Sequence, residues 1–338
     1  MAVQKIIIDC DPGIDDALAL VFAHGDPGLE LCGITTVAGN VGLDRTTANA
    51  LRVRDFIGMR EVPVVPGSAG PLLRPVLDAR HVHGASGLAG ARLPEPASAA
   101  AAGHAVDYLI ETISAAPGEI TLIAMGPLTN IALAVRREPL LAGRVRDFVI
   151  MGGSAGRGNV TPAAEFNMAA DPEAAAIVFG AGWTVTMVGL DVTLQARATT
   201  AVRGRMRGLG RLADDLLLPS LAGYLSGDAG GPARVGDPAV AAEQEMPDGH
   251  EWPDGPGGPA VHDVCAVARV ARPGLFSCVP ALVQVETTGR LTAGMTVTDF
   301  AAPPADCNAL VAMGIDVPGF WDLVLDGYTR VAAGMVAP

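Results

Sequence analysis

The stretch IIIDCDPGIDDALAL, residues 6–20, decides the fold of this 338-residue chain. Its isoleucine run predicts a strand, and the helical spacing of apolar residues over 15–23 predicts a helix directly after it. Pro12 favours an extended conformation at Asp11, and Gly13 permits a sharp turn between the two elements. A buried strand that turns at once into a helix is the first half of a βαβ unit.

The same alternation continues along the chain. Strand patterns lie at 5–10, 31–37, 62–65, 120–124, 147–151 and 184–190, and helical patterns lie at 15–23, 45–57, 103–115, 128–136 and 172–179. Strands that alternate with helices indicate an α/β fold with an open, mostly parallel, twisted sheet and helices on both faces. Two later segments, 281–288 and 295–299, predict a small additional β-pair.

We expect one domain over residues 1–338, with two segments that depart from the alternation. Residues 66–98 are rich in proline, glycine and histidine, and we interpret them as an active-site loop. Residues 226–260 combine many glycines and prolines with acidic residues against a single arginine. An insertion of this length is typical of a lid or of a disordered segment.

The composition excludes several classes of protein. The net charge of -13 argues against a nucleic-acid partner, because neutralising phosphates needs a cationic surface. No apolar run is long enough to span a bilayer, so we expect no membrane partner. The five cysteines are scattered without a CxxC pair, which favours reduced thiols and a cytoplasmic location.

Four carboxylates follow the first predicted strand. Asp9 and Asp11 lie two residues apart, and Asp15 and Asp16 fall in the first turn of the following helix. Ligands of open α/β sheets bind at the carboxyl ends of such strands. Crowded anions need a counter-charge, and oxygen-only ligands favour Ca²⁺ or Mg²⁺ over zinc. The alternative, capping of the helix by one aspartate, leaves the other carboxylates unexplained.

The run DCDPGIDDALAL resembles the signature of the inosine-uridine preferring nucleoside hydrolases. The resemblance extends, in order, through ITTVAGN (34–40), HVHGASG (81–87), MGPLTNIA (125–132), VIMGG (149–153), AEFNMAADPEAA (164–175), VGLDVT (188–193), VHD (261–263) and TGRLTAGMTVTDF (288–300). It therefore covers nearly the whole chain.

This resemblance implies one Ca²⁺ per subunit. Its ligands would be Asp11, Asp16, Asp263 and the main-chain carbonyl of Met125. Asp11 would also act as the general base for a calcium-bound water. Asp9 would not bind the ion but would support the residues that do.

The resemblance also implies the residues that contact the substrate. Cleavage of an N-glycosidic bond builds positive charge on the ribose, which carboxylates and amide oxygens stabilise. The residues expected to bind the substrate are Asp15, Asn40, Met151, Asn159, Glu165, Asn167, His262 and Asp263. His262 would protonate the departing base, an imidazole being suited to a general acid near neutrality. Alternatively, His262 caps the helix that begins beside it. His81 and His83 are interpreted as part of a closing loop.

The predicted function is hydrolysis of ribonucleosides to free base and ribose, in nucleoside catabolism and purine or pyrimidine salvage. The small-molecule partner is a nucleoside, and the family resemblance implies a homodimer or homotetramer. Two alternatives were weighed. A haloacid-dehalogenase-like Mg²⁺-dependent phosphatase shares a strand followed by DxD, but that family expects Thr or Val at the position of Gly13. A non-catalytic nucleoside-binding homologue would keep the fold. The base preference stays open, because the acidic insertion lacks the tyrosines expected around a base, Tyr224 being the nearest one, although His250 and Trp252 lie within it.

Overall fold

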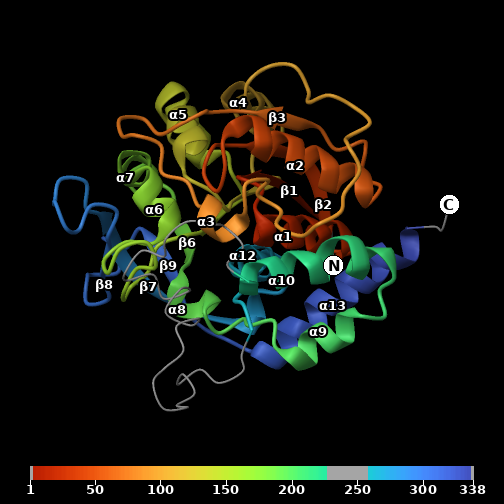
Figure 1. Cartoon of the computed structure of the whole chain (residues 1–338). Coiled ribbons are helices and arrows are strands. Elements are labelled where there is room, and N and C mark those ends of the chain that lie inside the picture. Colours follow the sequence, from red (N-terminus) through yellow and green to blue (C-terminus); the bar gives the residue numbers. More distant parts are fainter. Residues whose placement is uncertain (1–2, 227–257, 336–338) are drawn as a thin grey trace, which may run out of the picture.

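The computed structural model describes residues 3–226 and 258–335, so most of the predicted insertion at 226–260 lies outside the described residues. Within the described part, the strands form a nine-stranded sheet in the order β3-β2-β1-β4-β5-β6-β9-β7-β8 (Figure 1). The strands are β1 (Gln4–Cys10), β2 (Leu29–Thr36), β3 (Val64–Pro66), β4 (Ile120–Ala124), β5 (Asp147–Met151), β6 (Val185–Val188), β7 (Phe276–Val285), β8 (Thr296–Asp299) and β9 (Ala309–Ile315).

The pairing confirms the predicted open, mostly parallel sheet. Every pair from β3 across to β9 is parallel, whereas β7 pairs antiparallel with both β9 and β8. Strand β9 was not predicted, because a short apolar run cannot be told from a buried helix segment by its pattern. It lies between β6 and β7, so the predicted β-pair is the continuation of the main sheet.

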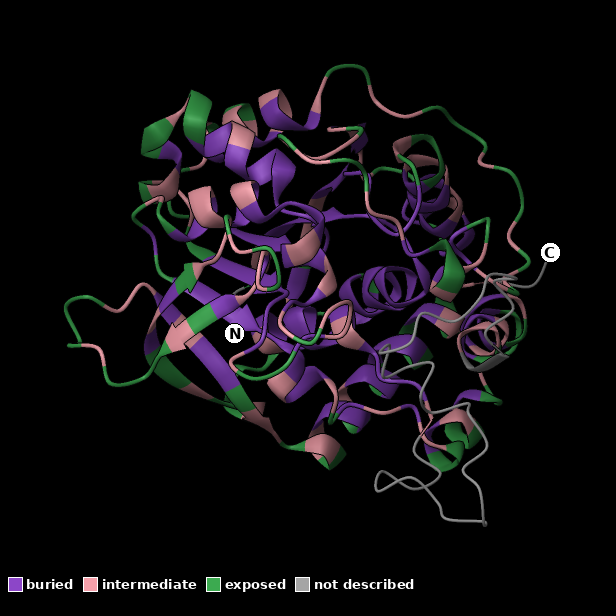
Figure 2. Cartoon of the chain, turned by 60° about the vertical axis from the view of Figure 1, so that its left-hand side comes forward, coloured by how far each residue is buried: buried purple, intermediate pink, exposed green. Residues whose placement is uncertain are grey.

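Helices cover both faces of the sheet, as predicted. Along β1, Ile6 and Ile8 face one hydrophobic core and Ile7 faces the other, because successive side chains of a strand alternate. The central strands β4 and β6 are wholly buried, whereas β7 and β8 at one edge of the sheet are partly exposed (Figure 2). The first core is covered by α1 (Ile14–Gly25), α2 (Leu43–Phe56), α12 (His262–Ala271) and α13 (Val317–Gly334), and the second by α4 (Ala105–Ala115), α5 (Thr129–Arg137) and α7 (Pro172–Phe179).

The long helix α13 packs against α1, so the last described helix covers the first. Gly25 faces the carbonyl oxygen of Gly327, and the hydroxyl of Tyr328 donates to the carbonyl of Leu18 at 3.2 Å. No helix in the two described ranges is long and apolar enough to cross a membrane. The shorter helical segments are α3 (Arg80–His83), α6 (Phe166–Ala170), α8 (Leu190–Thr193), α9 (Thr200–Met206), α10 (Leu218–Ser226), η1 (Pro139–Gly143), η2 (Ala213–Leu217) and η3 (Pro273–Leu275).

The strand order creates a topological switch point between β1 and β4. From β1 the chain proceeds to β2 on one side, and it later returns to β4 on the other side. The helices that follow these two strands, α1 and α5, lie on opposite faces of the sheet. The carboxyl ends of β1 and β4 therefore flank an opening, which is where α/β sheets of this kind bind ligands.

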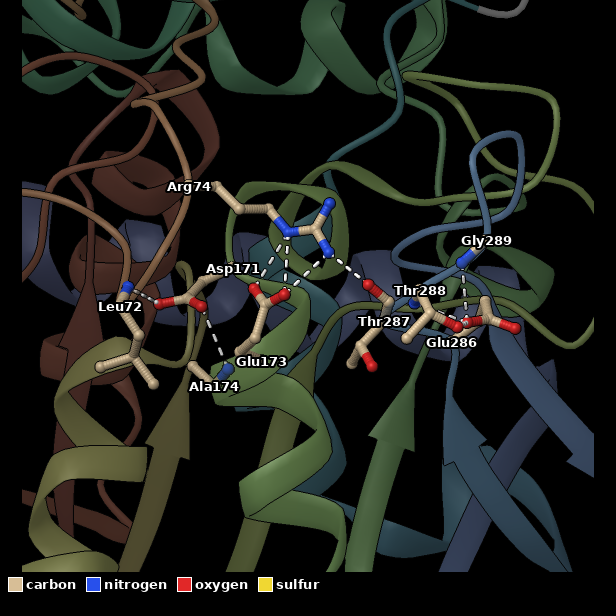
Figure 3. A network of polar contacts seen from close by, with 9 residues as sticks. All are labelled: Leu72, Arg74, Asp171, Glu173, Ala174, Glu286, Thr287, Thr288 and Gly289. Atoms are coloured by element: carbon tan, nitrogen blue, oxygen red, sulfur yellow. Dashed lines mark hydrogen bonds and ion pairs between the residues drawn. The ribbon is translucent and has the colours of Figure 1, made fainter.

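Segment 66–98 crosses the molecule with only the short helix α3, and polar contacts fasten its first part (Figure 3). The Arg74 guanidinium pairs with Glu173 in α7 at 2.7 Å and donates to the carbonyl of Thr287, beyond β7, at 2.5 Å. The N–H of Leu72 donates at 2.9 Å to the aspartate that precedes α7. These contacts join the loop to two distant parts of the sheet.

Candidate active site

Four aspartates gather at the switch point, and we call Asp11, Asp15, Asp16 and Asp263 the acidic cluster. Asp11 directly follows β1, Asp15 and Asp16 lie in the first turn of α1, and Asp263 lies in the first turn of α12. All four are buried. Carboxylate oxygens of Asp15, Asp16 and Asp263 lie within 4.8 Å of one another. Two segments far apart in the sequence thus supply one cluster.

Hydrogen bonds fix the turn that carries these groups. The Oδ1 atom of Asp16 accepts from the N–H of Asp11 at 3.1 Å, and its Oδ2 accepts from the N–H of Gly13 at 2.9 Å. The Asn40 side chain donates to Asp16 Oδ2 at 3.1 Å, and the Asn40 N–H donates to Asp11 Oδ2 at 2.6 Å. Asn40, predicted to contact ribose, therefore holds two of the carboxylates.

The backbone packs so closely around Asp11 that its neighbours must be glycines. A Cβ atom on Gly126 would lie 2.6 Å from Asp11 Oδ1, and one on Gly39 would collide with Asp11 Oδ2. The Oδ1 atom of Asp11 is buried and has no hydrogen-bond partner among the described residues. An ionised, buried oxygen without a donor is unfavourable unless a cation is present.

The electrostatics of the cluster point the same way. Burial raises the pKa of Asp16 to about 7, and it raises the pKa values of Asp11 and Asp263 well above their usual range. Negative charges on neighbouring carboxylates raise these three pKa values further. For Asp16 and Asp263, the largest such contribution comes from Asp15. An anionic, buried, oxygen-only donor set fits a hard divalent cation, so the residues present suit the predicted metal.

Four further predicted residues lie together where β4 and β5 end. Two of them, Met125 and Met151, adjoin these strands, and the other two lie at the start of α6. The Asn167 side chain donates to the carbonyl of Met125 at 2.8 Å and to the carbonyl of Met151 at 3.1 Å. Glu165 caps α6: its Oε1 accepts from the N–H of Asn167 at 3.0 Å, and its Oε2 accepts from the N–H of Gly153 at 2.9 Å. Burial raises the pKa of Glu165 to about 7, with a smaller contribution from the charge of a cluster member.

Asn159 has a different environment from the other predicted ribose residues. Its Oδ1 accepts from the N–H of Phe166 at 3.0 Å, which fastens the loop to the start of α6. This contact connects Asn159 to the element that carries Glu165 and Asn167, and it does not reach the acidic cluster.

Two histidines flank the cluster. The ring Nδ1 of His262 lies 2.8 Å from the hydroxyl of Thr193, at the end of α8. His262 is the first residue of α12 and does not cap the helix, since Val261 occupies the cap position. Burial lowers the pKa of His262, while the charge of Asp15 acts in the opposite direction. His262 is therefore close enough to the cluster to feel its charge.

The second histidine, His83, was interpreted from the sequence only as part of a loop. It is buried, its Nδ1 accepts from the N–H of Ile14 at 3.0 Å, and its ring contacts that of Tyr224 edge-on at 5.8 Å. A Cβ on Gly13 would lie 2.5 Å from this ring nitrogen. Gly13 has a φ of -98°, so the chain uses it for the space it leaves rather than for its conformational freedom.

Sequence reasoning also missed the polar residues that hold Asp9 behind the cluster. Its Oδ1 accepts from the Thr35 hydroxyl at 2.5 Å and from the Asn130 amide at 2.8 Å, while its buried Oδ2 has no partner in the part of the chain that the structure describes. Burial raises the pKa of Asp9 to about 7. Asn130 also accepts from the N–H of Ser68 at 2.9 Å, which ties the start of the loop to the site. The available signals were Thr35 near the end of β2 and Asn130 in the first turn of α5, two polar residues in otherwise apolar surroundings.

Comparison with known proteins agrees with this geometry. Residues 6–322 match the family model described as inosine-uridine preferring nucleoside hydrolase. The chain is 44% identical over 331 residues to the inosine-uridine preferring nucleoside hydrolase of Leishmania major, covering 97% of this chain and 98% of that protein. It is 42% identical over 330 residues to a non-specific ribonucleoside hydrolase of Salmonella typhi, covering 96% and 98% of the two chains. The solved structure of a purine-preferring ribonucleoside hydrolase from Gardnerella vaginalis superposes with a TM-score of 0.86 at 31% identity, covering 97% of this chain and 99% of that one.

The fold and the site together define a glycosidase that acts on N-glycosyl compounds, an N-ribosyl hydrolase. The match extends over nearly the whole chain, at more than 40% identity to two relatives of which it covers 98%. The chain belongs to the inosine-uridine preferring nucleoside hydrolase family.

Proposed function

We propose that this chain hydrolyses the N-glycosidic bond of ribonucleosides to free base and ribose, with one Ca²⁺ held at the acidic cluster. The observation that carries the proposal is the buried, oxygen-only cluster at the switch point, with Asp11 Oδ1 lacking a partner among the described residues. Asp11, Asp16, Asp263 and the carbonyl of Met125 are the proposed ligands. Calcium accepts six to eight oxygen ligands, so ribose hydroxyls can complete its shell.

Asp11 is the proposed general base. When bound, the cation would lower the pKa of a water molecule and hold it near the anomeric carbon. Asp11 Oδ2 accepts from the N–H of Asn40, whereas Oδ1 has no partner among the described residues, so the carboxylate has an oxygen left to face the ion and its water. Gly39 and Gly126 leave the space that this carboxylate occupies, since a Cβ atom on either glycine would overlap one of its oxygens.

The anionic surroundings match the charge that forms on the sugar. A carboxylate oxygen of Asp15 lies within 4.8 Å of oxygens of Asp16 and Asp263, and its charge also raises the pKa of Glu165. A positive charge that develops on the ribose is stabilised by carboxylates already fixed in place. The proposed ribose contacts are Asp15, Asn40, Met151, Asn159, Glu165, Asn167 and Asp263.

His262 is the proposed general acid for the departing base. It lies beside Asp263 and within the field of Asp15, so its ring is at the edge of the sugar site. A purine or pyrimidine leaves more easily once one of its nitrogens has accepted a proton. The relatives are named as purine-preferring, inosine-uridine preferring and non-specific hydrolases, so base preference varies among proteins of this fold.

The direct test is incubation with inosine, uridine or p-nitrophenyl phosphate, in Ca²⁺, in chelator, and in chelator followed by excess Ca²⁺. Free ribose is measured as reducing sugar, and p-nitrophenol is read by absorbance. We expect ribose from at least one nucleoside in Ca²⁺, a loss in chelator and recovery on adding Ca²⁺ back. Release of p-nitrophenol from the phosphate ester without ribose release from either nucleoside would refute the proposal.

The cellular setting follows from the resemblance and is part of the same proposal. We place the enzyme in the cytoplasm, in nucleoside catabolism and salvage, as a homodimer or homotetramer of a single domain. All five cysteines are free, which is compatible with a reducing compartment. Segment 66–98 is the proposed active-site loop, since His83 and Ser68 connect it to the turn after β1 and to Asn130.

A further inference from the structure

The block TGRLTAGMTVTDF (288–300) closes the hairpin between β7 and β8, and none of the proposed ion or ribose contacts lies in it. Its backbone is fastened where the connection returns to β8. The carbonyl of Glu286 accepts from the N–H of Gly294 at 2.7 Å, and the N–H of Glu286 donates to the carbonyl of Met295 at 2.9 Å. The first residue of β8, Thr296, therefore has a defined place at the edge of the sheet.

Thr296 holds the turn that follows β5. The N–H of Ser154 donates to Thr296 Oγ1 at 2.9 Å, and the Thr296 hydroxyl donates to the carbonyl of Ser154 at 2.6 Å. Both directions are fixed, because a backbone N–H only donates and a carbonyl only accepts. Both residues are buried, so this hydroxyl takes the place that water would have at the surface.

The residue before Ser154 connects this turn to the ribose site. Gly153 donates its N–H to Oε2 of Glu165 at 2.9 Å, and its carbonyl accepts from the N–H of Leu190 at 3.0 Å. The φ of Gly153 is 73°, in the left-handed region that favours glycine. Glycine has few steric limits of its own, so the contacts on either side select the conformation of the turn. A change at Ser154 is therefore passed directly to the residue that binds Glu165.

The hairpin also packs against the far end of the segment that begins at this turn. A Cβ atom on Gly294 would lie 2.8 Å from the Cα of Ala169 in α6 and 3.1 Å from the Cβ of Ala164. The hairpin thus contacts both ends of residues 153–169, the segment that carries Glu165.

We propose that Thr296 is a positioning residue: by holding Ser154, it sets the place of Glu165 at the ribose. This inference rests on the proposed function, in which Glu165 contacts the sugar. In this role Thr296 touches neither the substrate nor the ion. Because its hydroxyl bonds to Ser154, which is not a proposed Ca²⁺ ligand, Thr296 should govern sugar binding without changing the affinity for Ca²⁺.

The kinetic test removes the hydroxyl and then restores it. Thr296→Val keeps the shape and the strand preference of threonine, but it leaves the N–H and the carbonyl of Ser154 without this partner. A misplacement of about 1 Å can cost roughly 100-fold in rate, so we expect kcat/KM for inosine to fall roughly 10- to 100-fold, with a higher KM. Thr296→Ser keeps the hydroxyl and should keep the wild-type KM. An unchanged KM in Thr296→Val, or equally raised KM values in both variants, would overturn the inference.

A matched control is available in Thr46, another buried threonine, whose hydroxyl donates to the carbonyl of Leu43 inside α2. Thr46→Val should leave KM unchanged. KM does not depend on the concentration of folded enzyme, so partial unfolding of a variant cannot imitate the expected change. Titration calorimetry should give the same Ca²⁺ affinity for the wild type and for Thr296→Val. A weaker affinity in Thr296→Val would overturn the inference, because Thr296 would then act through the ion site.

A double-mutant cycle tests whether Thr296 acts through Glu165. Glu165→Ala removes the side chain whose place is in question. Residues that act through one another are not additive, so Thr296→Val should raise KM much less in the Glu165→Ala background than in the wild type. A rise of equal size in both backgrounds would overturn the inference.

Amide hydrogen exchange tests the contact without any catalysis. Exchange is followed by mass spectrometry in Ca²⁺-loaded protein, on peptides that span residues 153–169. We expect faster exchange in Thr296→Val than in the wild type, because local opening becomes easier when the turn loses its partner. Thr296→Ser and Thr46→Val should exchange at the wild-type rate in these peptides. Equal exchange in the wild type and Thr296→Val would overturn the inference, whereas absence of nucleoside cleavage by the wild type would overturn only the proposed function.

Discussion

Withdrawing Ca²⁺ should lower the melting temperature of this protein strongly at pH 8 and very little at pH 5. The reason lies in the buried carboxylates at the switch point. Burial raises the pKa values of Asp9 and Asp16 to about 7 from an ordinary 3.8, and it raises those of Asp11 and Asp263 well above that value. Without a cation, the folded chain therefore holds protons that the unfolded chain has already released.

The sign and the size of the effect follow from proton linkage. A carboxyl with a raised folded-state pKa favours the folded state below its unfolded pKa, and this contribution is lost as the pH rises through the folded value. For a single group such as Asp16, the loss is about 4 kcal/mol once it is complete near pH 8. A bound cation compensates the ionised groups at pH 8, whereas protons compete with it at pH 5.

The assay is a thermal melt of metal-free protein at pH 5, 6, 7 and 8, with and without millimolar Ca²⁺. A chain of this size shifts its melting temperature by roughly 2 °C per kcal/mol, so we expect a gap of roughly 8 °C at pH 8. The gap should shrink steadily toward pH 5. Comparing the two melts at one pH removes the contribution of every group that does not feel the cation. A gap that is absent at pH 8, or equal at pH 5 and pH 8, would refute this reasoning.

Four other changes test the site and its scaffold. Asp11→Asn should reduce kcat for inosine by roughly 100- to 10,000-fold, because it removes the general base and keeps the shape of the side chain. The circular dichroism spectrum should not change, and a near wild-type rate would exclude Asp11 as the general base. Gly126→Ala should weaken Ca²⁺ binding in titration calorimetry, since its Cβ would lie 2.6 Å from Asp11 Oδ1; unchanged affinity would count against Asp11 as a ligand. Gly25→Ala should lower the free energy of unfolding in urea by about 2 kcal/mol without changing kcat, because its Cβ would strike the Gly327 carbonyl where α1 meets α13. Arg74→Ala should cost at most about 1 kcal/mol, as its ion pair is partly exposed, yet it should speed proteolysis within the loop that follows β3; cleavage at the wild-type rate would show that the tether is dispensable.

Much of the fold could be predicted because its elements carry strong local patterns. The strands at 120–124 and 147–151 and the helix at 172–179 coincide with β4, β5 and α7, since each is an apolar run bounded by turn residues. Strand β9 and helix α13 were missed. They follow one another as a strand and a helix, but β9 is a short apolar run, and a pattern of that length does not separate a strand from a helix segment. Strand β9 joins the sheet between β6 and β7, neither of which adjoins it in the sequence.

The candidate site could likewise be predicted only in part. The carboxylates after β1 are contiguous in the sequence, so spacing alone places them at one edge of the sheet. Their partners are not contiguous: His83 reaches the N–H of Ile14, and Thr193 reaches His262, each across 69 residues. Contacts over such separations depend on how helices and loops pack, and the residue pattern along a single chain does not contain that information.

The packing of α13 on α1 has a consequence for the order in which the enzyme acquires its parts. Helix α1 carries Asp15 and Asp16, and it reaches its final packing only when residues 317–334 cover it. A ribosome makes α1 long before α13, so a growing chain holds an acidic turn whose helix lacks its cover. Asp263 is also made long after the first aspartates. The proposed ion site therefore forms only after residues 262–334 have been made, and a chain released before that point would have the first aspartates without Asp263 or the cover of α1.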